Sequence, residues 1–246
     1  MIRWLAILAI AAMAASAAHA APDPVALSHK MDTLWRAESS RATVTMRVVT
    51  PDYARSLSLD VWSEGREHTL IRITAPRKEA GISTLKRGTE MWNYLPKIRK
   101  TIRIPPSMMM GSWMGSDLTN DDLVRDSLWE EDYTVVLAPT SPPGQVCLDY
   151  SPKPDAPVTW SKVTTCFEAN TELPLGQVFF DEKGRAARRI EFGAPREIGG
   201  RTVPTRLSVV PLLETGRRTE FTYESLEFGV KHPPDTFSIG RLERGR

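Results

Sequence analysis

Between residues 42 and 228 the sequence repeatedly alternates apolar and polar residues with a period of two. The first two segments of this kind are ATVTMRVVT, at residues 42–50, and SLSLDVW, at residues 56–62. Successive side chains of a β-strand point to opposite faces of the sheet, so each segment has one apolar and one polar face. Glycine, proline, aspartate or asparagine separates the segments, as expected for turns. The pattern therefore predicts a long antiparallel meander.

Many further segments follow the same pattern. They are HTLIRIT (68–74), ISTLKRG (82–88), TEMWNYL (89–95), IRKTIRI (98–104), DYTVVLA (132–138), QVCLDY (145–150), SKVTTCFE (161–168), GQVFFDEKG (176–184), AARRIEFG (186–193), TVPTRLSVV (202–210) and TEFTYESLEF (219–228). So many strands with one apolar face each favour a large curved sheet or an open barrel over a parallel α/β fold. A barrel that its side chains do not fill contains a cavity, and such cavities hold ligands.

Two segments have a helical pattern instead. In PVALSHKMDTLWRAES the apolar residues at helical spacing are Leu27, Met31, Leu34 and Trp35. This spacing predicts an amphipathic helix near the N-terminus. In SDLTNDDLVRDS, at residues 116–127, Thr119 or Asn120 is a suitable N-cap for a short second helix. Because this helix and the loop before it interrupt the meander in its middle, we expect them to cover the barrel mouth.

The first twenty residues, MIRWLAILAIAAMAASAAHA, have the features of a cleaved secretory signal peptide: Arg3, an apolar run, and small residues at its end. An N-terminal membrane anchor is the alternative, but the apolar run is short. No later segment has the roughly 18 uninterrupted apolar residues of a spanning helix. No repeat, low-complexity tract or linker divides residues 21–246. We therefore expect an exported chain with a single domain.

Cys147 and Cys166 are the only two cysteines, and both lie in the exported part of the chain. Each belongs to a predicted strand, and the proline-rich turn SPKPDAP lies between the two strands. A hairpin would bring the two cysteines together, and an oxidising compartment permits a disulfide. Two free buried thiols are the alternative. Neither state suggests catalysis, because the motif Cys-x-x-Cys is absent.

The sequence offers no pattern typical of an enzyme, a metal site or a cofactor site. The histidines of the mature chain, His29, His68 and His232, lack the spacing of zinc ligands. GSWMG, at residues 111–115, has Trp113 where a nucleophile elbow requires serine. A net charge of +2 does not suggest a nucleic-acid partner. We therefore expect a protein that is not an enzyme, and an exported hydrolase is the weakest alternative.

The segment SMMMGSWMGS, at residues 107–116, is the main candidate for ligand binding. Its apolar side chains are Met108, Met109, Met110, Trp113 and Met114. Methionine side chains repack at little cost against varied apolar partners, and tryptophan offers a large flat face. The glycines and serines between them favour a movable flap over the cavity. The alternative is a fixed loop that fills the core.

Trp92 and Tyr94 alternate with their neighbours in TEMWNYL, so they share one face of that strand. We expect both side chains to line the cavity, with plain core packing as the alternative.

Four cations precede the methionine segment and form a basic strip: Lys97, Arg99, Lys100 and Arg103. Cations beside an apolar entrance suit docking on anionic headgroups or on an acidic surface of a membrane partner. The alternative is an edge strand whose charges prevent aggregation.

The sequence from residue 73 to residue 125 resembles a known family, most clearly in MWNYLP, at residues 91–96, and MMGSWMGSDLTNDDL, at residues 109–123. It is similar to the exported outer-membrane lipoprotein-sorting proteins, a branch related to the periplasmic lipoprotein carrier LolA. The resemblance implies an unclosed antiparallel β-barrel with helices over its mouth and an apolar cavity for acyl chains.

The resemblance also implies a function. A protein of this family carries lipoprotein acyl chains or phospholipid through the periplasm, from an inner-membrane transporter or permease to an outer-membrane acceptor. The alternative is a periplasmic sensor or interaction module that responds to lipids or lipoproteins and signals to a membrane-bound partner.

Overall fold

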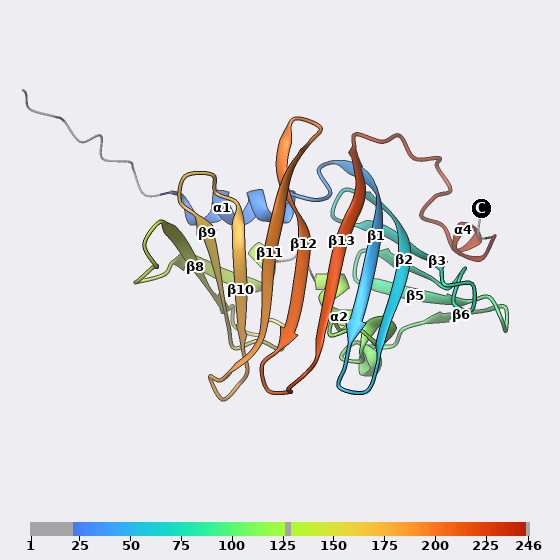
Figure 1. The fold of residues 1–246 in the computed structure, drawn as a ribbon, viewed down its shortest axis with the longest axis horizontal. Coiled ribbons are helices and arrows are strands. Elements are labelled where there is room, and N and C mark those ends of the chain that lie inside the picture. The colour runs from blue at the N-terminus through green and yellow to red at the C-terminus, as the bar shows by residue number, and fades with distance from the viewer. Residues whose placement is uncertain (1–21, 126–128, 245–246) are drawn as a thin grey trace, which may run out of the picture.

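The computed structural model describes residues 22–125 and 129–244, so the predicted signal peptide lies outside the described residues. Within these residues, thirteen antiparallel strands form one sheet in the order β6-β5-β4-β3-β2-β1-β13-β12-β11-β10-β9-β8-β7 (Figure 1). The strands are β1 (Ser39–Val49), β2 (Ala54–Glu64), β3 (His68–Ala75), β4 (Ser83–Arg87), β5 (Glu90–Leu95), β6 (Lys100–Arg103), β7 (Tyr133–Leu137), β8 (Gln145–Pro152), β9 (Lys162–Glu168), β10 (Pro174–Phe180), β11 (Ala186–Ile198), β12 (Arg201–Pro211) and β13 (Arg218–Phe228). Each of the segments predicted to be strands is a strand.

The sheet consists of two wings of consecutive hairpins. β1 to β6 form one wing and β7 to β13 form the other, and the two wings join where β1 pairs with β13. β6 and β7 are the two edge strands, so the sheet does not close. The predicted mainly β, unclosed antiparallel architecture is therefore confirmed.

Helix α1 (Pro24–Asp32) is the predicted N-terminal helix, although it ends earlier than the apolar spacing indicated. Asp23 caps its start, because its carboxylate accepts a hydrogen bond of 3.0 Å from the Val25 amide. Trp35 lies beyond the end of the helix, and its indole nitrogen donates to the Pro204 carbonyl at 2.8 Å. The chain leaves the helix early because Trp35 packs against the sheet.

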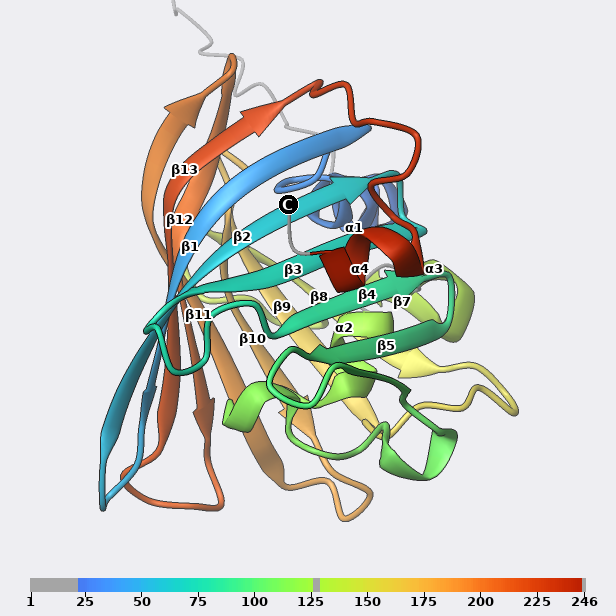
Figure 2. The same cartoon turned by 90° about the vertical axis from the view of Figure 1, so that its right-hand side faces the viewer.

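The chain between β6 and β7 joins the two edge strands and lies on the concave side of the sheet (Figure 2). It contains two short 3₁₀ turns (Pro106–Met108 and Trp113–Gly115) and the helices α2 (Asn120–Arg125) and α3 (Trp129–Asp132). Thr119 is the N-cap of α2: its amide donates to Asp122 at 2.7 Å, and the Asp122 amide donates to the Thr119 hydroxyl at 3.1 Å. This reciprocal pair is a capping box, and it fixes the start of the predicted second helix.

The two faces of the sheet are covered differently. On the concave face, a core cluster joins β1 and β2 to Trp113, and another joins α1 to the strands of the second wing. On the outer face, α4 (Ile239–Arg244) lies against β3 and β4 (Figure 2). Its Leu242 packs with Leu70 and Leu85. Both faces of the first wing are therefore partly buried.

Cys147 and Cys166 form a disulfide bond. They lie directly opposite each other on β8 and β9, as the predicted hairpin requires. Among the described residues, no helix has both the length and the apolar character needed to cross a membrane.

Candidate ligand-binding cavity

A cavity of about 340 Å³ lies between the concave face of the sheet and the segments that cover it. We call it the inner cavity. Its floor comes from strands near the junction of the wings, and it includes Ala42 and Val44 of β1 and Val209 of β12. Because side chains alternate along a strand, Arg41 and Thr43 point to the opposite face. The apolar face of the strands thus forms one wall of the inner cavity.

Aromatic side chains form much of the wall on the side of the second wing. Trp35 stacks on Phe192, with ring centroids 5.5 Å apart. Phe179 lies between two tryptophans, with its ring centroid 5.3 Å from Trp160 and 6.3 Å from Trp129. These five rings all line the inner cavity. Rings of this size bury large apolar areas, so this wall suits an apolar ligand.

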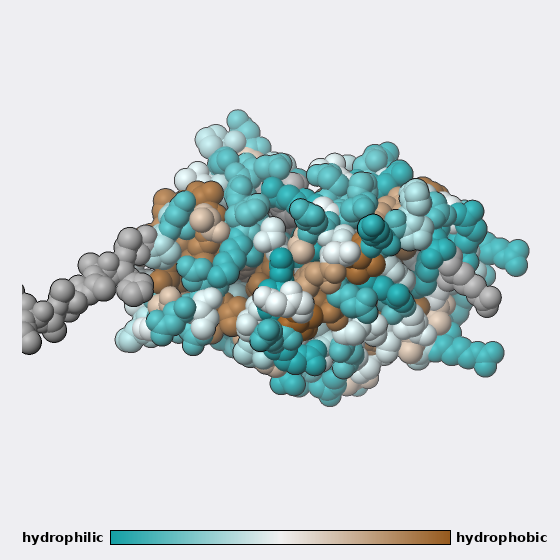
Figure 3. Space-filling view, turned by 90° about the horizontal axis from the view of Figure 1, so that it is seen from above, coloured by the Kyte–Doolittle hydropathy of each residue, from teal (hydrophilic) through white to brown (hydrophobic). Residues whose placement is uncertain are grey.

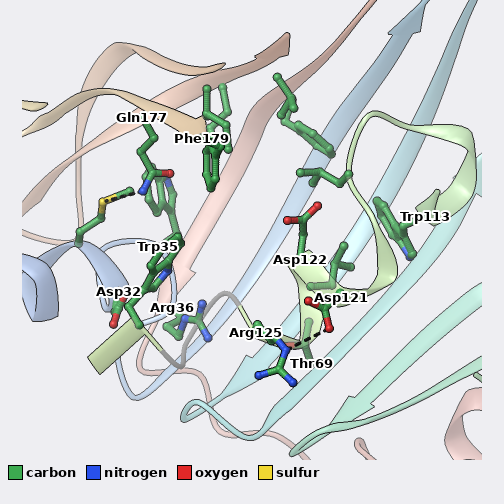
Figure 4. Close-up of a pocket in the computed structure, with 18 of the residues that line it drawn as sticks. Asp32, Trp35, Arg36, Thr69, Trp113, Asp121, Asp122, Arg125, Gln177 and Phe179 are labelled. Carbon is green, nitrogen blue, oxygen red and sulfur yellow. Dashed lines mark hydrogen bonds and ion pairs between the residues drawn. The ribbon is translucent and has the colours of Figure 1, made fainter. Parts of the chain in front are cut away.

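Trp113 closes the opposite side of the inner cavity (Figure 4). Its side chain is 2% exposed, and its indole nitrogen donates to the Thr84 hydroxyl at 3.1 Å. It packs with core residues of β1 and β2. Trp113 therefore both lines the inner cavity and belongs to the core, and its role in ligand binding stays a prediction.

Arg188, on β11, is a cation at the wall of the inner cavity. Its guanidinium contacts both oxygens of Asp122 on α2, at 2.6 and 2.8 Å. It also lies over the rings of Phe179 and Trp160, at 4.2 and 4.7 Å from the centroids. The Arg188 side chain is buried, and a buried charge requires a partner of this kind. The pair ties α2 to the second wing of the sheet.

A second group of charges lies beside α2 at the same cavity (Figure 4). Arg125 donates to Asp121 at 3.1 Å and to Asp132 of α3 at 2.9 Å. Burial raises the pKa of the Asp121 carboxyl, and the charge of Arg125 opposes that shift. Burial also raises the pKa of the nearby Tyr133 hydroxyl above its ordinary value. These groups make one polar margin on an otherwise apolar cavity.

The structure separates the four methionines of the predicted flap. Met108 and Met110 are 55% and 51% exposed, whereas Met109 packs against a small core cluster beside α2. Met114 packs against the main core cluster of the concave face. None of the four is among the residues that line the inner cavity. The segment therefore contributes Trp113 to the cavity and presents two methionines to the outside.

Hydrogen bonds hold this methionine segment in place. The Asn120 side chain donates to the carbonyls of Met108 and Gly111, at 3.1 and 3.2 Å. Arg55 donates to the carbonyl of Met114. Across the mouth, the Thr159 hydroxyl lies 3.3 Å from the sulfur of Met110. Thr159 follows β8 and lines the inner cavity, so this contact links the two wings.

Trp92 and Tyr94 do not line the inner cavity, and the expectation for both residues needs correction. They pack on the outer face with Leu70, Leu85 and Leu242. Met91, their neighbour on β5, is fully buried on the concave side next to α2. The reason is that α4 covers the outer face of this wing, so both faces of β5 carry apolar side chains.

The basic strip lies along the edge of the first wing. Lys97 and Arg99 belong to the turn between β5 and β6, whereas Lys100 and Arg103 belong to β6. Arg103 pairs with Glu90 on β5. Two apolar side chains stand among these cations, Ile98 at 57% and Ile102 at 42% exposed. The edge therefore combines positive charge with exposed apolar surface.

Most of the residues that line the inner cavity could not be predicted from the sequence. Ala42 and Val44 carried a signal, because they lie on the apolar face of a predicted strand. Arg188 carried no sequence signal. The adjacent Arg189 gives the same local pattern, and only the fold shows which of the two is buried. The mouth contact of Thr159 likewise depends on how the two wings approach each other.

Several solved structures have the same fold as this chain. A DUF1329 family protein from Desulfovibrio piger is 24% identical with a TM-score of 0.78, and the match covers 90% of this chain and 100% of that one. A LolA superfamily protein from Nitrosomonas europaea is 22% identical with a TM-score of 0.74, with the same two coverages, 90% and 100%. A domain assigned by name to the outer membrane lipoprotein-sorting proteins, from Vibrio parahaemolyticus, is 19% identical with a TM-score of 0.75, covering 89% of this chain and 97% of that one.

These likenesses confirm, at the level of the fold, the relation to LolA-like proteins that the sequence motifs predicted. No curated protein matches the chain. A family model described as that of an uncharacterized protein matches residues 65–244. This match spans most of the sequence, so the chain belongs to that family and has the fold of the LolA superfamily.

Proposed function

We propose that this protein is a periplasmic carrier, not an enzyme, that binds the acyl chains of lipoproteins or lipids in the inner cavity. It takes them from an inner-membrane transporter or permease and delivers them to an outer-membrane acceptor. The observation that carries the proposal is the apolar and aromatic inner cavity of about 340 Å³ on the concave face of an unclosed sheet. This volume lies within the range of about 300–1,000 Å³ that is usual for small-molecule sites.

The chemistry of the walls supports an acyl ligand. Hydrocarbon gains free energy when it leaves water for an apolar wall, roughly 25 cal/mol for each Å² of apolar surface that is buried. This gain does not depend on direction, so binding tolerates chains of different length. The charged groups of α2, Asp121, Asp122 and Arg125, lie at the polar margin of the cavity. In the proposed complex they face the polar end of the ligand, while the rings contain its tail.

The methionine segment is the part of the cover that we expect to move. Its hydrogen bond to the opposite wing, within the described residues, runs from the Thr159 hydroxyl to the sulfur of Met110. A hydrogen bond to a thioether sulfur is weaker than the hydrogen bonds to oxygen that hold the rest of the segment. Exposed Met108 and Met110 adapt readily to an acyl chain that enters between the two wings. The rest of the segment keeps Trp113 in place.

A pair of substitutions on neighbouring residues of β1 tests the inner cavity. Val44→Phe fills the cavity, and Thr45→Phe adds the same ring on the opposite face of the strand. We expect Val44→Phe to weaken binding of a fluorescent fatty acid at least tenfold and Thr45→Phe to leave it unchanged. Native mass spectrometry of protein isolated from its own periplasm measures the retained lipid in parallel.

Either of two results contradicts the acyl-binding proposal. One is equal loss of fatty-acid binding in both phenylalanine variants, and the other is a protein that retains no lipid and binds no fatty acid. Val61→Phe is a second blocking variant for the case in which Val44→Phe does not fold. A protein that binds lipid but never transfers it between vesicles is a sensor and not a carrier.

A covalent link across the mouth tests the movement of the methionine segment. Met110→Cys and Thr159→Cys place two thiols next to each other, and the native cysteines do not react because they are paired. A short thiol-reactive cross-linker should slow fatty-acid entry at least tenfold in the double variant. Each single variant with the same reagent is the control. Unchanged entry in the linked protein would mean that the ligand takes another route.

The basic strip is the proposed docking edge for anionic headgroups of the donor or acceptor membrane. Lys97, Arg99 and Lys100 pair with no acidic group among the described residues. Exposed Ile98 and Ile102 stand between them. Cations with exposed apolar side chains bind an anionic bilayer through both charge and burial, at about 1 kcal/mol for each cation near the surface.

Vesicle sedimentation tests the docking edge. Replacing Arg99 and Lys100 by glutamine should reduce binding to anionic vesicles several-fold and leave the weak binding to neutral vesicles unchanged. Replacing Lys183 and Arg185 by glutamine, in the turn between β10 and β11, removes the same charge from the other wing and is the control. If both double variants lose binding equally, only net charge matters and the docking edge is wrong.

A further inference from the structure

A second cavity, of about 230 Å³, lies on the outer face of the sheet. Strands β1 to β3 form one side, and the segment that follows β13 forms the other. We call it the outer pocket. Its lining includes five cationic or titratable basic side chains: Arg41, Arg72, Lys231, His232 and Arg241. The lining contains no carboxylate. This charge distribution separates the outer pocket from the apolar inner cavity, which lies on the other face of the same strands.

Trp62 holds two of the guanidinium groups in position. Arg41 and Arg72 lie over its ring, 5.9 and 5.7 Å from the centroid. A cation–π contact of this kind holds a guanidinium near the ring and leaves its N–H groups able to donate to a ligand. Arg41 is exposed, and its side chain makes no hydrogen bond or ion pair with the described residues, so its guanidinium donors are available.

Arg72 is the buried cation of the outer pocket, with only 8% of its surface exposed. Its Nε donates to the Ser83 hydroxyl at 3.1 Å, and one Nη donates to the carbonyl of Arg241 at 3.0 Å. Both acceptors are neutral. Burial lowers the pKa of Arg72, the charge of Arg241 lowers it further, and Asp60 acts in the opposite direction. A bound anion would relieve the repulsion between these two arginines.

The segment after β13 supplies further donors. The Nε2 of His232 lies 3.0 Å from the Ser63 carbonyl, and a carbonyl only accepts, so this nitrogen carries the proton. The Thr236 hydroxyl is buried and has no hydrogen-bond partner among the described residues. A buried hydroxyl without a partner is costly, and a ligand in the outer pocket that bonds it would remove this cost.

We propose that the outer pocket binds a phosphate group. Phosphate matches the two guanidinium groups, because Arg41 can donate two parallel N–H bonds to its oxygens and Arg72 keeps N–H groups that its bonds to Ser83 and Arg241 do not use. The Thr236 hydroxyl and the Lys231 ammonium are additional donors around the same space. A volume of about 230 Å³ is below the range of about 300–1,000 Å³ for drug-sized ligands, so it suits a phosphate with at most a small substituent.

The proposal does not depend on acyl binding, because the sheet separates the two sites. Arg41 faces the outer pocket and Ala42, the next residue, faces the inner cavity. The phosphate group belongs either to a lipid headgroup or to a small soluble compound. Both sources present the same chemistry to the pocket, and the experiment distinguishes them.

Titration with inorganic phosphate at constant ionic strength tests the proposal directly. Phosphate should raise the melting temperature in a saturable way, because a ligand that binds only the folded state stabilises it. Replacing exposed Arg41 and Lys231 by glutamine should weaken phosphate binding at least tenfold without loss of folding. Arg87→Gln is the matched control, because Arg87 also lies over a tryptophan of the same wing, Trp92, at 4.7 Å, and lies outside the pocket.

The Thr236→Val variant should not lower stability, but it should weaken phosphate binding. The variant keeps the shape of the side chain and removes the unsatisfied hydroxyl, so the protein without phosphate should be as stable as the unaltered chain or more stable. Its phosphate binding should nevertheless be weaker. The proposal is wrong if phosphate stabilises the protein no more than chloride does at equal ionic strength. It is also wrong if Arg87→Gln loses as much phosphate binding as the Arg41 and Lys231 double variant.

Vesicles that contain phosphatidic acid identify the source of the phosphate. If the pocket binds a headgroup, vesicle binding falls in the Arg41 and Lys231 double variant, and inorganic phosphate competes with the vesicles. If the pocket binds a soluble compound, inorganic phosphate binds the unaltered protein, and the Arg41 and Lys231 double variant binds the vesicles as well as the unaltered protein does. The docking-edge variant at Arg99 and Lys100 serves as the comparison, because it should bind inorganic phosphate normally.

Discussion

Trp113 closes one side of the inner cavity. It reaches from the methionine segment into the core of the first wing, where its indole nitrogen bonds Thr84. The flanking methionines lie elsewhere, so one aromatic side chain performs the covering that the sequence pattern assigned to five residues together. A loop can therefore anchor itself with one buried side chain and still present flexible ones at its surface.

We predict that Trp113→Ala destabilises the protein by about 3–5 kcal/mol, the usual cost of removing a fully buried large aromatic side chain. Urea unfolding followed by circular dichroism measures the change. Met110→Ala, at a side chain that is 51% exposed, should change stability by less than about 0.5 kcal/mol. Similar effects of the two substitutions would show that Trp113 does not anchor the segment.

Asp121 makes the stability of the protein depend on pH in a direction that is unusual for aspartate. Burial raises its pKa in the folded state above the ordinary value of 3.8, so the folded state holds the proton more tightly than the unfolded state. The contribution of Asp121 to stability is therefore present at low pH and is lost as pH rises through the raised pKa.

The Asp121→Asn variant isolates this contribution, because asparagine does not titrate. We expect the stability of the variant relative to the unaltered chain to increase as pH rises from 3.8 through the raised pKa of folded Asp121, and then to stay constant. Urea unfolding at several pH values gives both curves. An opposite slope would mean that the ion pair with Arg125 outweighs burial.

Among the elements, the hairpin of β8 and β9 is the one that a covalent bond secures. Cys147 and Cys166 are 19 residues apart in sequence and belong to the wing that ends in the edge strand β7. Replacing both by serine should cost about 3 kcal/mol, because the bond restricts a loop of this length in the unfolded chain. Urea unfolding with and without reductant measures the cost, and reductant should not change the stability of the double variant.

The elements could be predicted from the sequence to different degrees. The strands could be predicted, because the alternation of apolar and polar residues is a local property of each segment. The end of α1 could not, since Trp35 continues the helical spacing but bonds the distant Pro204 carbonyl. The inward face of β5 could not be chosen either, because α4 covers the outer face and makes Trp92 and Met91 equally suited to burial.

The same limit applies to the two candidate sites. Trp113 could be placed at a cavity because the apolar segment that contains it interrupts the meander. The outer pocket could not be predicted, because Arg41 and Arg241 come from opposite ends of the described chain and meet only in the fold. Contacts between distant parts of the chain, and not residue type, determine which cations line the outer pocket.

At the scale of the whole molecule, the C-terminal tail is a structural cover for the outer face of the first wing. Leu242 is fully buried there against Leu70 and Leu85. Removing residues 237–246 should expose this cluster and destabilise the protein by more than about 2 kcal/mol. Unfolding by urea and binding of a hydrophobic dye measure the two effects.

The comparison for this truncation is Leu242→Ala, which should cost about 2–5 kcal/mol by itself. A truncated protein with unchanged stability and no added dye binding would show that the tail is dispensable. Fatty-acid binding should survive the truncation if the protein stays folded, because the inner cavity lies on the other face of the sheet.

The pairing of β1 with β13 sets the order in which the molecule can assemble. All other neighbouring strands follow each other directly along the chain, so each wing can form by local pairing of consecutive hairpins. The pairing in the middle of the sheet, by contrast, requires β13, the last strand of the chain. Pairings between segments as distant as β1 and β13 form slowly. Until then β1 presents a bare edge that a second chain could occupy. We therefore expect a folding copy of the chain to be most prone to aggregation just before β13 pairs with β1.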